Sequence, residues 1–323
     1  MLLIVSVTSD VTADFLEKKI TERNLPCARF NTEHFPLEIS LSCEHSGKTH
    51  GKLKMDGGRV IELSDIRSIW WRRPYQIEPT SLRCIEGEEA RRFALLNTRE
   101  TLNQVWDFLL DRCLWVNYPL NNRRAESRLL QMEVAKSVGL SSPMTLVSNA
   151  PEQITQFWES LKGRVVIKAL RRTAFFSDGE MYGFYTSPFL ESHLKCVNNA
   201  RLGPVFLQEL VEKKTEFRVT VIGSRVFAAA MECDSVDWRT IRTENQVWRP
   251  FSLDPNLARM CLEVVRKLSL NFGTLDIALM NSGKPVFFEV NPNGQWAWLE
   301  IQNGIPMSEA FIELFFGDKN AQL

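Results

Sequence analysis

The chain has 323 residues, a formal net charge of zero, and 44% hydrophobic and 24% charged residues. This length suits two or three packed units, and the zero net charge provides no overall field that would attract nucleic acid or a membrane surface. The seven cysteines are scattered with no CxxC pair, which favours reduced thiols over disulfides or a zinc site. No apolar run approaches the ~18 residues of a membrane span, and we expect a cytoplasmic protein.

The first 120 residues are predicted to form an α/β domain. The apolar run Leu2–Val7 predicts a buried parallel strand, and residues at helical spacing separate it from a second strand at Cys27–Asn31. A further strand is predicted at Ser68–Arg72, and a long helix is predicted over residues 88–110.

The remainder is predicted to form two further units, residues 121–204 and 205–323. Each combines helical periodicity with short β runs. The helices are expected at 124–138, 151–161, 256–268 and 307–316, and the strands at 165–169, 175–176, 181–185, 206–211, 217–222, 226–231, 275–280 and 286–290. Ser187 and Pro188 carry the signal for the start of one more helix.

The strongest chemical pattern is TLDIALMNSGKPVFFEVNPNG near the end of the chain. A two-residue loop at Ser282-Gly283 would place Asp276 directly opposite Glu289, with Asn291 on the same face. Facing carboxylates repel each other, whereas two carboxylates and an amide oxygen suit Mg²⁺. We therefore favour a magnesium site over an exposed sheet face, a shifted register or a protonated pair.

Three cationic positions have both a functional and a structural interpretation. Lys168 ends the apolar strand VVIK, where it would reach a nucleotide phosphate or merely mark a strand end. Arg218 lies inside an apolar strand and needs a partner, which would be a phosphate or a buried acid. Arg128 on a predicted helix is either a ligand or a solvated surface residue.

The segment IWWRRPY ends a strand of the first domain. Alternation along the strand sends Arg72 and Arg73 to opposite sides, so one of them is expected to face the crevice. Its guanidinium would bind a substrate carboxylate or the transferring phosphoryl group. Structural stacking on tryptophan is an equally good interpretation.

These motifs occur in the order seen in the ATP-grasp superfamily, which the chain resembles: a lysine-bearing strand, QELV, ExRVxVIG, LD and FEVNPNG. The segments DVTADF, RFNTEHFP, IWWRRPY and NPNGQWAWLE resemble a narrower group, the graspetide maturases, which are microviridin-type peptide cross-linking ligases. The resemblance covers nearly the whole chain. It implies an α/β, ATP-grasp fold in which an N-terminal domain precedes two lobes that sandwich ATP, and it suggests a homodimer.

The resemblance also implies roles for individual residues. Asp276, Glu289 and Asn291 match the magnesium ligands. The residues assigned to ATP are Arg128, Lys168, Gln208, Glu209, Leu210, Val211, Glu212 and Glu216, with 209–211 at the adenine and Glu212 or Glu216 at the ribose. The arginines expected to stabilise the transferring phosphoryl group are Arg72, Arg73, Arg171, Arg172 and Arg218. Arg128 stands where a lysine is expected, and the loop after Lys168 lacks the glycines of many relatives.

Aromatic residues in the central unit exceed what a nucleotide lid needs. By the same resemblance a leader segment of the substrate would bind at this hairpin and helix, through Phe184, Tyr185, Phe189 and Glu191. The alternative is that these aromatics form the unit's own core.

The expected function is ATP- and Mg²⁺-dependent ligation. The γ-phosphoryl group would pass to an Asp or Glu side chain of a ribosomally made precursor peptide, and a Ser/Thr hydroxyl or Lys amine would then displace phosphate, giving a macrocyclic ester or amide. No protein nucleophile is needed, and no P-loop, GxGxxG, GxSxG or HExxH motif is present. The alternatives are a ligase that adds free amino acids to a protein or small acid, and a catalytically dead nucleotide-binding module.

Overall fold

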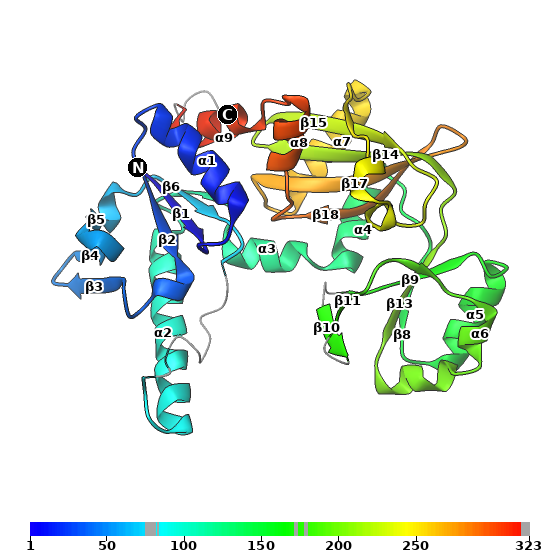
Figure 1. The fold of residues 1–323 in the computed structure, drawn as a ribbon, viewed down its shortest axis with the longest axis horizontal. Helices are drawn as coiled ribbons and strands as arrows, with labels where there is room; N and C mark the ends of the chain where they lie inside the picture. Colours follow the sequence, from blue (N-terminus) through cyan, green and yellow to red (C-terminus); the bar gives the residue numbers. More distant parts are fainter. Residues whose placement is uncertain (75–81, 83, 171–173, 178–179, 318–323) are drawn as a thin grey trace.

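The computed structural model describes residues 1–74, 82, 84–170, 174–177 and 180–317 of the chain. An N-terminal α/β unit, a five-stranded sheet and a smaller central lobe follow one another across the molecule (Figure 1). No helix among these residues is long and apolar enough to cross a membrane.

The N-terminal unit is built on a parallel sheet with the strand order β2-β1-β6-β7. Its strands are β1 (Leu2–Ser6), β2 (Cys27–Asn31), β6 (Ser68–Trp71) and β7 (Leu114–Val116), and its helices are α1 (Val11–Glu22) and α2 (Glu88–Leu109). A separate antiparallel sheet contains β3 (Ser40–His45), β4 (Thr49–Lys54) and β5 (Val60–Glu62). The strands predicted at Cys27–Asn31 and Ser68–Arg72 and the long helix are therefore present, with ends within two residues.

The C-terminal part of the chain forms an antiparallel sheet with the order β16-β15-β14-β17-β18. Its strands are β14 (Lys213–Ile222), β15 (Arg225–Glu232), β16 (Arg249–Pro250), β17 (Phe272–Met280) and β18 (Pro285–Asn291). Its helices are α7 (Pro255–Lys267), α8 (Ala297–Asn303) and α9 (Met307–Phe316). Helix α8 was not predicted from the sequence.

The central lobe contains the sheet β12-β9-β13-β8 and a two-stranded hairpin. The sheet strands are β8 (Thr145–Ser148), β9 (Val165–Lys168), β12 (Ser187–Pro188) and β13 (Val205–Glu209), the hairpin is β10 (Ala174–Ser177) with β11 (Glu180–Gly183), and the helices are α5 (Pro151–Ser160) and α6 (Glu191–Leu194). The prediction of a helix start at Ser187 is wrong. Ser187 and Pro188 pair with β9 as an edge strand, and the helix begins only at Glu191.

A single helix predicted over residues 124–138 is in fact two. Helix α3 (Pro119–Ala125) ends before Ser127, whose hydroxyl accepts from the backbone N–H of Leu130 and caps α4 (Arg128–Ser137). The break makes Arg128 the first residue of α4, and α4 packs against β18 and α7.

Packing joins the N-terminal unit to the five-stranded sheet through one core. Trp70 and Val116 from the parallel sheet belong to the same buried cluster as Phe272, Trp296 and Phe311. The central lobe has a small core of its own, formed by Ile154, Val165, Phe189, Ala200 and Leu207. The lobe is therefore attached to a larger part of the molecule that has a core of its own, and the boundary between the two lies beside β9 and β13 (Figure 1).

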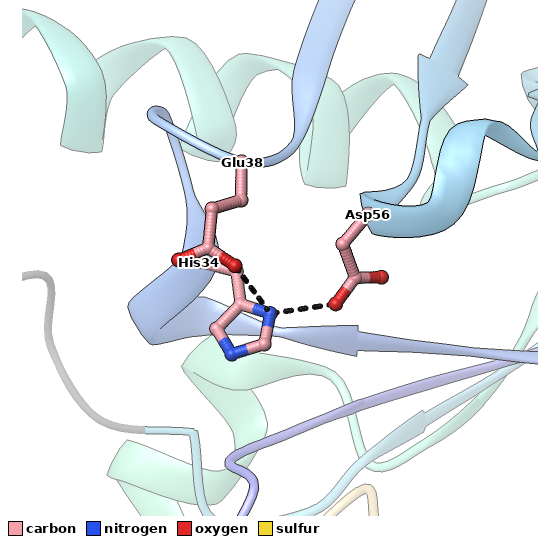
Figure 2. Close-up of side chains that lie close together, drawn as sticks. All are labelled: His34, Glu38 and Asp56. Atoms are coloured by element: carbon pink, nitrogen blue, oxygen red, sulfur yellow. Dashed lines mark hydrogen bonds and ion pairs between the residues drawn. The ribbon is translucent and has the colours of Figure 1, made fainter.

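One group of possible metal ligands lies in the N-terminal unit, apart from the five-stranded sheet and from the central lobe. His34 Nδ1 contacts Asp56 Oδ2 at 2.8 Å and Glu38 Oε2 at 3.5 Å (Figure 2). Both carboxylates approach the same ring nitrogen, and the contact between His34 and Asp56 joins the β2–β3 connection to the β4–β5 connection.

Candidate active site

A cleft of about 1070 Å³, its open mouth included, lies between the central sheet and the five-stranded sheet. Of the residues singled out from the sequence, its lining includes Arg128, Lys168, Phe184, Gln208, Glu209, Leu210, Val211, Glu216, Asp276 and Glu289. Ligand-binding residues predicted from several distant segments thus come together in one place.

A row of four charged side chains, two carboxylates flanked by two arginines, crosses the floor of the cleft. Arg218 on β14 pairs in register with Asp276 on β17, which pairs in turn with Glu289 on β18. Arg218 Nη1 lies 2.6 Å from Asp276 Oδ1, and Arg128 Nη1 from α4 lies 2.6 Å from Glu289 Oε2. The facing carboxylates were expected to repel each other, but each has an arginine partner, so the row is electrostatically favourable.

The predicted pairing of Asp276 with Glu289 is confirmed, although the predicted loop is wrong. The loop contains three residues, 281–283. The Met280 N–H donates to the Lys284 carbonyl across it, and Gly283 has a φ of 81°. This shifts the register by one until a β-bulge between Asp276 and Ile277 restores it. Because of the bulge, Phe288 and Glu289 both line the cleft, whereas Phe287 lies in the core.

These side chains fit a magnesium ion. Asn291 Nδ2 donates to Glu289 Oε1 at 2.8 Å, so its carbonyl oxygen is left as a hard ligand beside the two carboxylates. A bound cation would share the carboxylates with Arg128 and Arg218 or displace those guanidinium groups. The assignment of Asp276, Glu289 and Asn291 as metal ligands remains a prediction.

Lys168 faces this row from the opposite side of the cleft. Its ammonium group donates to Gln208 Oε1 at 2.7 Å and lies 4.8 Å from the centre of the Phe288 ring. Burial lowers the pKa of Lys168 to about 8, against the opposing effect of Glu289 and with the help of nearby Arg128. Lys213 further lowers this pKa and Asp237 raises it. A phosphate placed here would favour the charged form.

We expect nucleotide binding to take up a proton above pH 8, because phosphates raise the depressed pKa of Lys168. Affinity for Mg·ADP should therefore fall as pH rises through 8. Folding without ligand depends on pH in the opposite direction. The folded protein loses this proton near pH 8, whereas the unfolded chain keeps it up to about pH 10.4. The contribution of Lys168 to the free energy of unfolding therefore increases as pH rises above 8.

Calorimetry of Mg·ADP binding at pH 8.5 in two buffers of different ionisation enthalpy measures the proton uptake. Lys168→Met should abolish the uptake and weaken binding by about 10- to 150-fold, which corresponds to the loss of a charge-assisted contact. Equal proton uptake by the wild type and the variant would show that Lys168 does not meet the phosphates.

The connection between the two sheets forms the rim of the cleft. Residues 210–212 join β13 to β14, and the backbone N–H groups of Glu209 and Leu210 donate to Met144 and Arg164 at 2.8 and 2.9 Å. This edge is where the resemblance placed the adenine, and that placement stays a prediction.

The two glutamates proposed for the ribose have different surroundings. Glu216 lies in the cleft wall, and its pKa is raised by burial in spite of a 2.9 Å ion pair with Lys213. Lys213 also donates to the carbonyls of Ser235 and Val236. Glu212 is exposed, pairs with Arg164 at 3.2 Å and is not part of the lining. The geometry therefore favours Glu216 as the residue near a bound nucleotide.

Arg72 is a fully buried link between domains and does not line the cleft. It donates to the carbonyl of Asn293 at 2.8 Å and to Gln295 Oε1 at 2.7 Å, and its Nε lies 3.2 Å from Asp10. Burial lowers its pKa to about 10 although Asp10 opposes the shift. Arg73 donates to the same Asn293 carbonyl from the surface. Neither arginine is among the residues that line the cleft, and a catalytic role for either stays a prediction.

The loop after β18 connects Arg72 to the charge row. Arg218 Nη2 contacts the carbonyl of Gln295 at 3.3 Å, while Arg72 binds the side chain of the same residue. Gly294 lies against Thr274 so closely that an added Cβ would be 2.2 Å from its hydroxyl. The NPNGQ segment thus ties the N-terminal unit to the floor of the cleft.

The residues predicted to bind a leader peptide separate into two groups. Phe184 and Tyr185 are about half exposed, and Glu191 is exposed on α6. Phe189 is buried in the core of the central lobe, where its ring packs against that of His193 in a tilted arrangement. For Phe189 the structural interpretation holds, because its backbone pairs with β9 and turns the side chain inward. Arg171 and Arg172 lie outside the described residues.

Three functional candidates in the cleft were missed by the sequence analysis. Lys213, Asp237 and Arg239 line it together with the residues above. Asp237 and Arg239 come from the short 3-10 turn Trp238–Thr240 and the residue that caps it. An acid two residues before an arginine, next to tryptophan in a loop, is their only sequence signal, and it has no periodicity to mark it.

Comparison with known proteins agrees with this geometry. Residues 1–123 match the family described as the MvdD pre-ATP grasp domain. The macrocyclase MdnC of Microcystis aeruginosa, solved with its precursor peptide MdnA, is 27% identical with a TM-score of 0.84, covering 98% of this chain and 99% of that one. A RiPP-associated ATP-grasp ligase of Chryseobacterium gregarium, solved with ADP and with a leader and core peptide, is 25% identical with a TM-score of 0.86, covering 97% and 96%.

A more distant relative comes from Thioalkalivibrio sulfidiphilus and is named "Probable alpha-L-glutamate ligase". It is 24% identical over 211 residues, which are 64% of this chain and 68% of that protein. D-cycloserine synthetase DcsG, at 14% identity and a TM-score of 0.53, shares the fold alone. The chain thus has the ATP-grasp fold, and over nearly its whole length it resembles RiPP-associated ATP-grasp ligases and macrocyclases.

Proposed function

We propose that this protein is an ATP-dependent ligase that cross-links a ribosomally made precursor peptide. The observation that carries the proposal is the row Arg218, Asp276, Glu289 and Arg128, which faces Lys168 across a cleft between two lobes. Carboxylates for Mg²⁺ and cations for phosphates are the two requirements of phosphoryl transfer. The similarity to peptide-modifying relatives along 97–98% of the chain supports a peptide substrate.

In the proposed reaction an Asp or Glu side chain of the peptide attacks the γ-phosphorus of ATP, which gives an acyl phosphate and ADP. A Ser/Thr hydroxyl or Lys amine of the same peptide then attacks the acyl carbon, phosphate leaves, and the nucleophile loses its proton. Mg²⁺, when bound, would neutralise charge that develops on the phosphates. Lys168 and Arg128 would hold phosphate oxygens, and Arg218 would hold Asp276 in place. The product would be a macrocyclic ester or amide.

The substrate's leader segment would dock on the central lobe next to the cleft. This placement is supported by three exposed or half-exposed side chains, those of Phe184, Tyr185 and Glu191. Phe189 lies in the core and is therefore left out of the proposed docking surface. We also propose that the protein works as a homodimer, which sedimentation of the purified chain would test.

A second candidate function is the addition of free amino acids to a protein or small acid, favoured by the glutamate ligase relative. That match spans 64% of this chain, whereas the peptide-modifying relatives match nearly all of it. The third alternative, a dead nucleotide-binding module, is disfavoured because Asp276, Glu289 and Asn291 come together.

Substrate-dependent ADP release separates these functions. We expect ADP to form with Mg·ATP only when a peptide with Asp or Glu and Ser, Thr or Lys residues is added, such as one encoded beside this chain's gene. Hydroxylamine should trap the acyl phosphate as a hydroxamate on the peptide. ADP release with free amino acids and an unrelated acid, but not with any peptide, would favour the second function.

A further inference from the structure

We propose that Arg239 binds the substrate carboxylate that is to be phosphorylated, and that Asp237 is the positioning residue that holds its guanidinium toward the cleft. The inference rests on the proposed ligase function and identifies a residue for the acceptor acid.

Asp237 fixes Arg239 through a two-point contact. Arg239 Nε donates to Asp237 Oδ1 at 2.8 Å, and Arg239 Nη2 donates to Asp237 Oδ2. The Asp237 side chain also accepts from the backbone N–H of Arg239, which caps the 3-10 turn. The side chain of Asp237 is 4% exposed and that of Arg239 is 31% exposed. A buried carboxylate thus orients a guanidinium that remains accessible from the cleft.

The pair keeps its charges at any physiological pH. Burial alone would raise the pKa of Asp237, but the hydrogen bonds and charge of Arg239 and the N–H of Thr186 outweigh it and lower the pKa to about 2. Asp237 in turn raises the pKa of Arg239, as do the charges of Glu289 and Asp276. Arg239 is therefore a permanent cation within electrostatic range of the proposed metal ligands.

Arg239 lies between these ligands and the surface proposed for the peptide. On one side it shares the cleft lining with Asp276 and Glu289. On the other side its guanidinium carbon lies 5.7 Å from the centre of the Tyr185 ring. Arg239 is thus placed to meet a peptide carboxylate that passes Tyr185 on its way to a phosphate beside the metal.

Asp237 also connects the two lobes at this point. Its Oδ2 accepts from the backbone N–H of Thr186, directly before β12 of the central lobe, at 3.0 Å. The carboxylate therefore holds Arg239 and the peptide-proximal segment at once. If Asp237 only stabilised the local turn, its contacts within residues 237–240 would be sufficient.

The other cationic side chains that line the cleft already have partners within the protein. Lys213 makes three contacts, with Glu216 and two carbonyls. Arg128 binds Glu289, and Lys168 binds Gln208 beside it, so both lie where nucleotide phosphates are expected. Arg239 uses Nε and Nη2 for Asp237, and among the described residues Nη1 has no acceptor. A bidentate carboxylate needs such an additional donor edge.

The test compares peptide and nucleotide parameters in matched variants. Arg239→Gln, Arg239→Lys and Asp237→Asn are measured for Mg·ADP affinity with a fluorescent ADP, for KM and kcat with a peptide that the wild type turns over, and for thermal unfolding. Arg225→Gln is the control, because Arg225 pairs with Glu313 on the surface at 2.9 Å and does not line the cleft.

We expect Arg239→Gln to lower kcat/KM for the peptide by about 10- to 150-fold, the loss of one charge-assisted contact, and to leave Mg·ADP affinity within twofold. Arg239→Lys should recover part of the loss, since it keeps the charge without the fork. Asp237→Asn should also lower kcat/KM for the peptide without changing Mg·ADP affinity, but by a smaller factor. The control should match the wild type.

Two results would overturn the inference. An equal loss of Mg·ADP affinity in Arg239→Gln would make Arg239 a nucleotide residue, and unchanged peptide kinetics in a folded variant would make the pair a structural staple. Failure of the proposed function itself is distinguishable, because the wild type would then release no ADP with any peptide.

Discussion

Replacement of Gly294 with alanine is expected to lower the free energy of unfolding by at least ~1–3 kcal/mol and to abolish nucleotide-dependent activity. The added Cβ would meet Thr274 Oγ1 at 2.2 Å and Thr274 Cβ at 2.4 Å, distances that side chains do not tolerate. Thr274 is fully buried on β17, two residues from Asp276. The loop or the strand must move, and Arg218 is bonded to both, to Gln295 in the loop and to Asp276 on the strand.

Thermal and urea unfolding of Gly294→Ala, with ADP release, checks this result. Gly203→Ala is the matched control, because a Cβ there meets nothing within 4 Å and its φ of −164° suits any residue. Wild-type stability and activity in Gly294→Ala would show that the close contact between Gly294 and Thr274 does not explain why glycine occupies this position of NPNG.

Glu289→Gln is expected to reduce turnover by more than ~100-fold, since loss of a residue that only supports a metal ligand already costs 10- to 100-fold. The amide keeps an oxygen for Asn291 but loses the charge that pairs with Arg128 and attracts Mg²⁺. From the sequence alone, removal of one of two facing carboxylates should stabilise the protein. The observed arginine partners reverse that expectation, so we predict no gain in thermal stability.

Binding of Mn²⁺ as a spectroscopic substitute for Mg²⁺ gives a readout independent of turnover. Glu289→Gln should bind Mn²⁺ with nucleotide more weakly than the wild type. Glu313→Gln is the control, because Glu313 is exposed, pairs with Arg225 and lies outside the cleft lining. Normal Mn²⁺ binding and turnover in Glu289→Gln would remove this residue from the proposed metal site.

The sequence predicted the charged positions better than their partners. Asp276 and Glu289 stand out because carboxylates interrupt apolar β runs, and strand counting paired them correctly. The count succeeded because the one-residue error in the loop is compensated by the bulge at Phe288. Two adjacent phenylalanines give no sign of which one faces the core, so the bulge could not be read from the pattern.

Contacts between distant segments account for the rest. Arg72 is held by carbonyls about 220 residues away, and alternation along one strand cannot reveal this. Arg128 was recognised, but its partner Glu289 depends on how α4 packs against β18. Asp237 and Arg239 lie in an irregular loop, where local patterns carry little information about position. Phe189 shows the reverse error, since an aromatic next to a predicted binding helix belongs to the core.

The most direct test of the proposed function is the intact mass of a peptide after incubation with the purified protein, ATP and Mg²⁺. The peptide should be encoded beside this chain's gene and contain Asp or Glu together with Ser, Thr or Lys. We predict that its mass falls by one water for each cross-link formed, that ADP appears in the same number, and that Glu289→Gln gives neither. ADP formation with a peptide of unchanged mass, or a peptide that gains the mass of an added amino acid, would contradict the assignment.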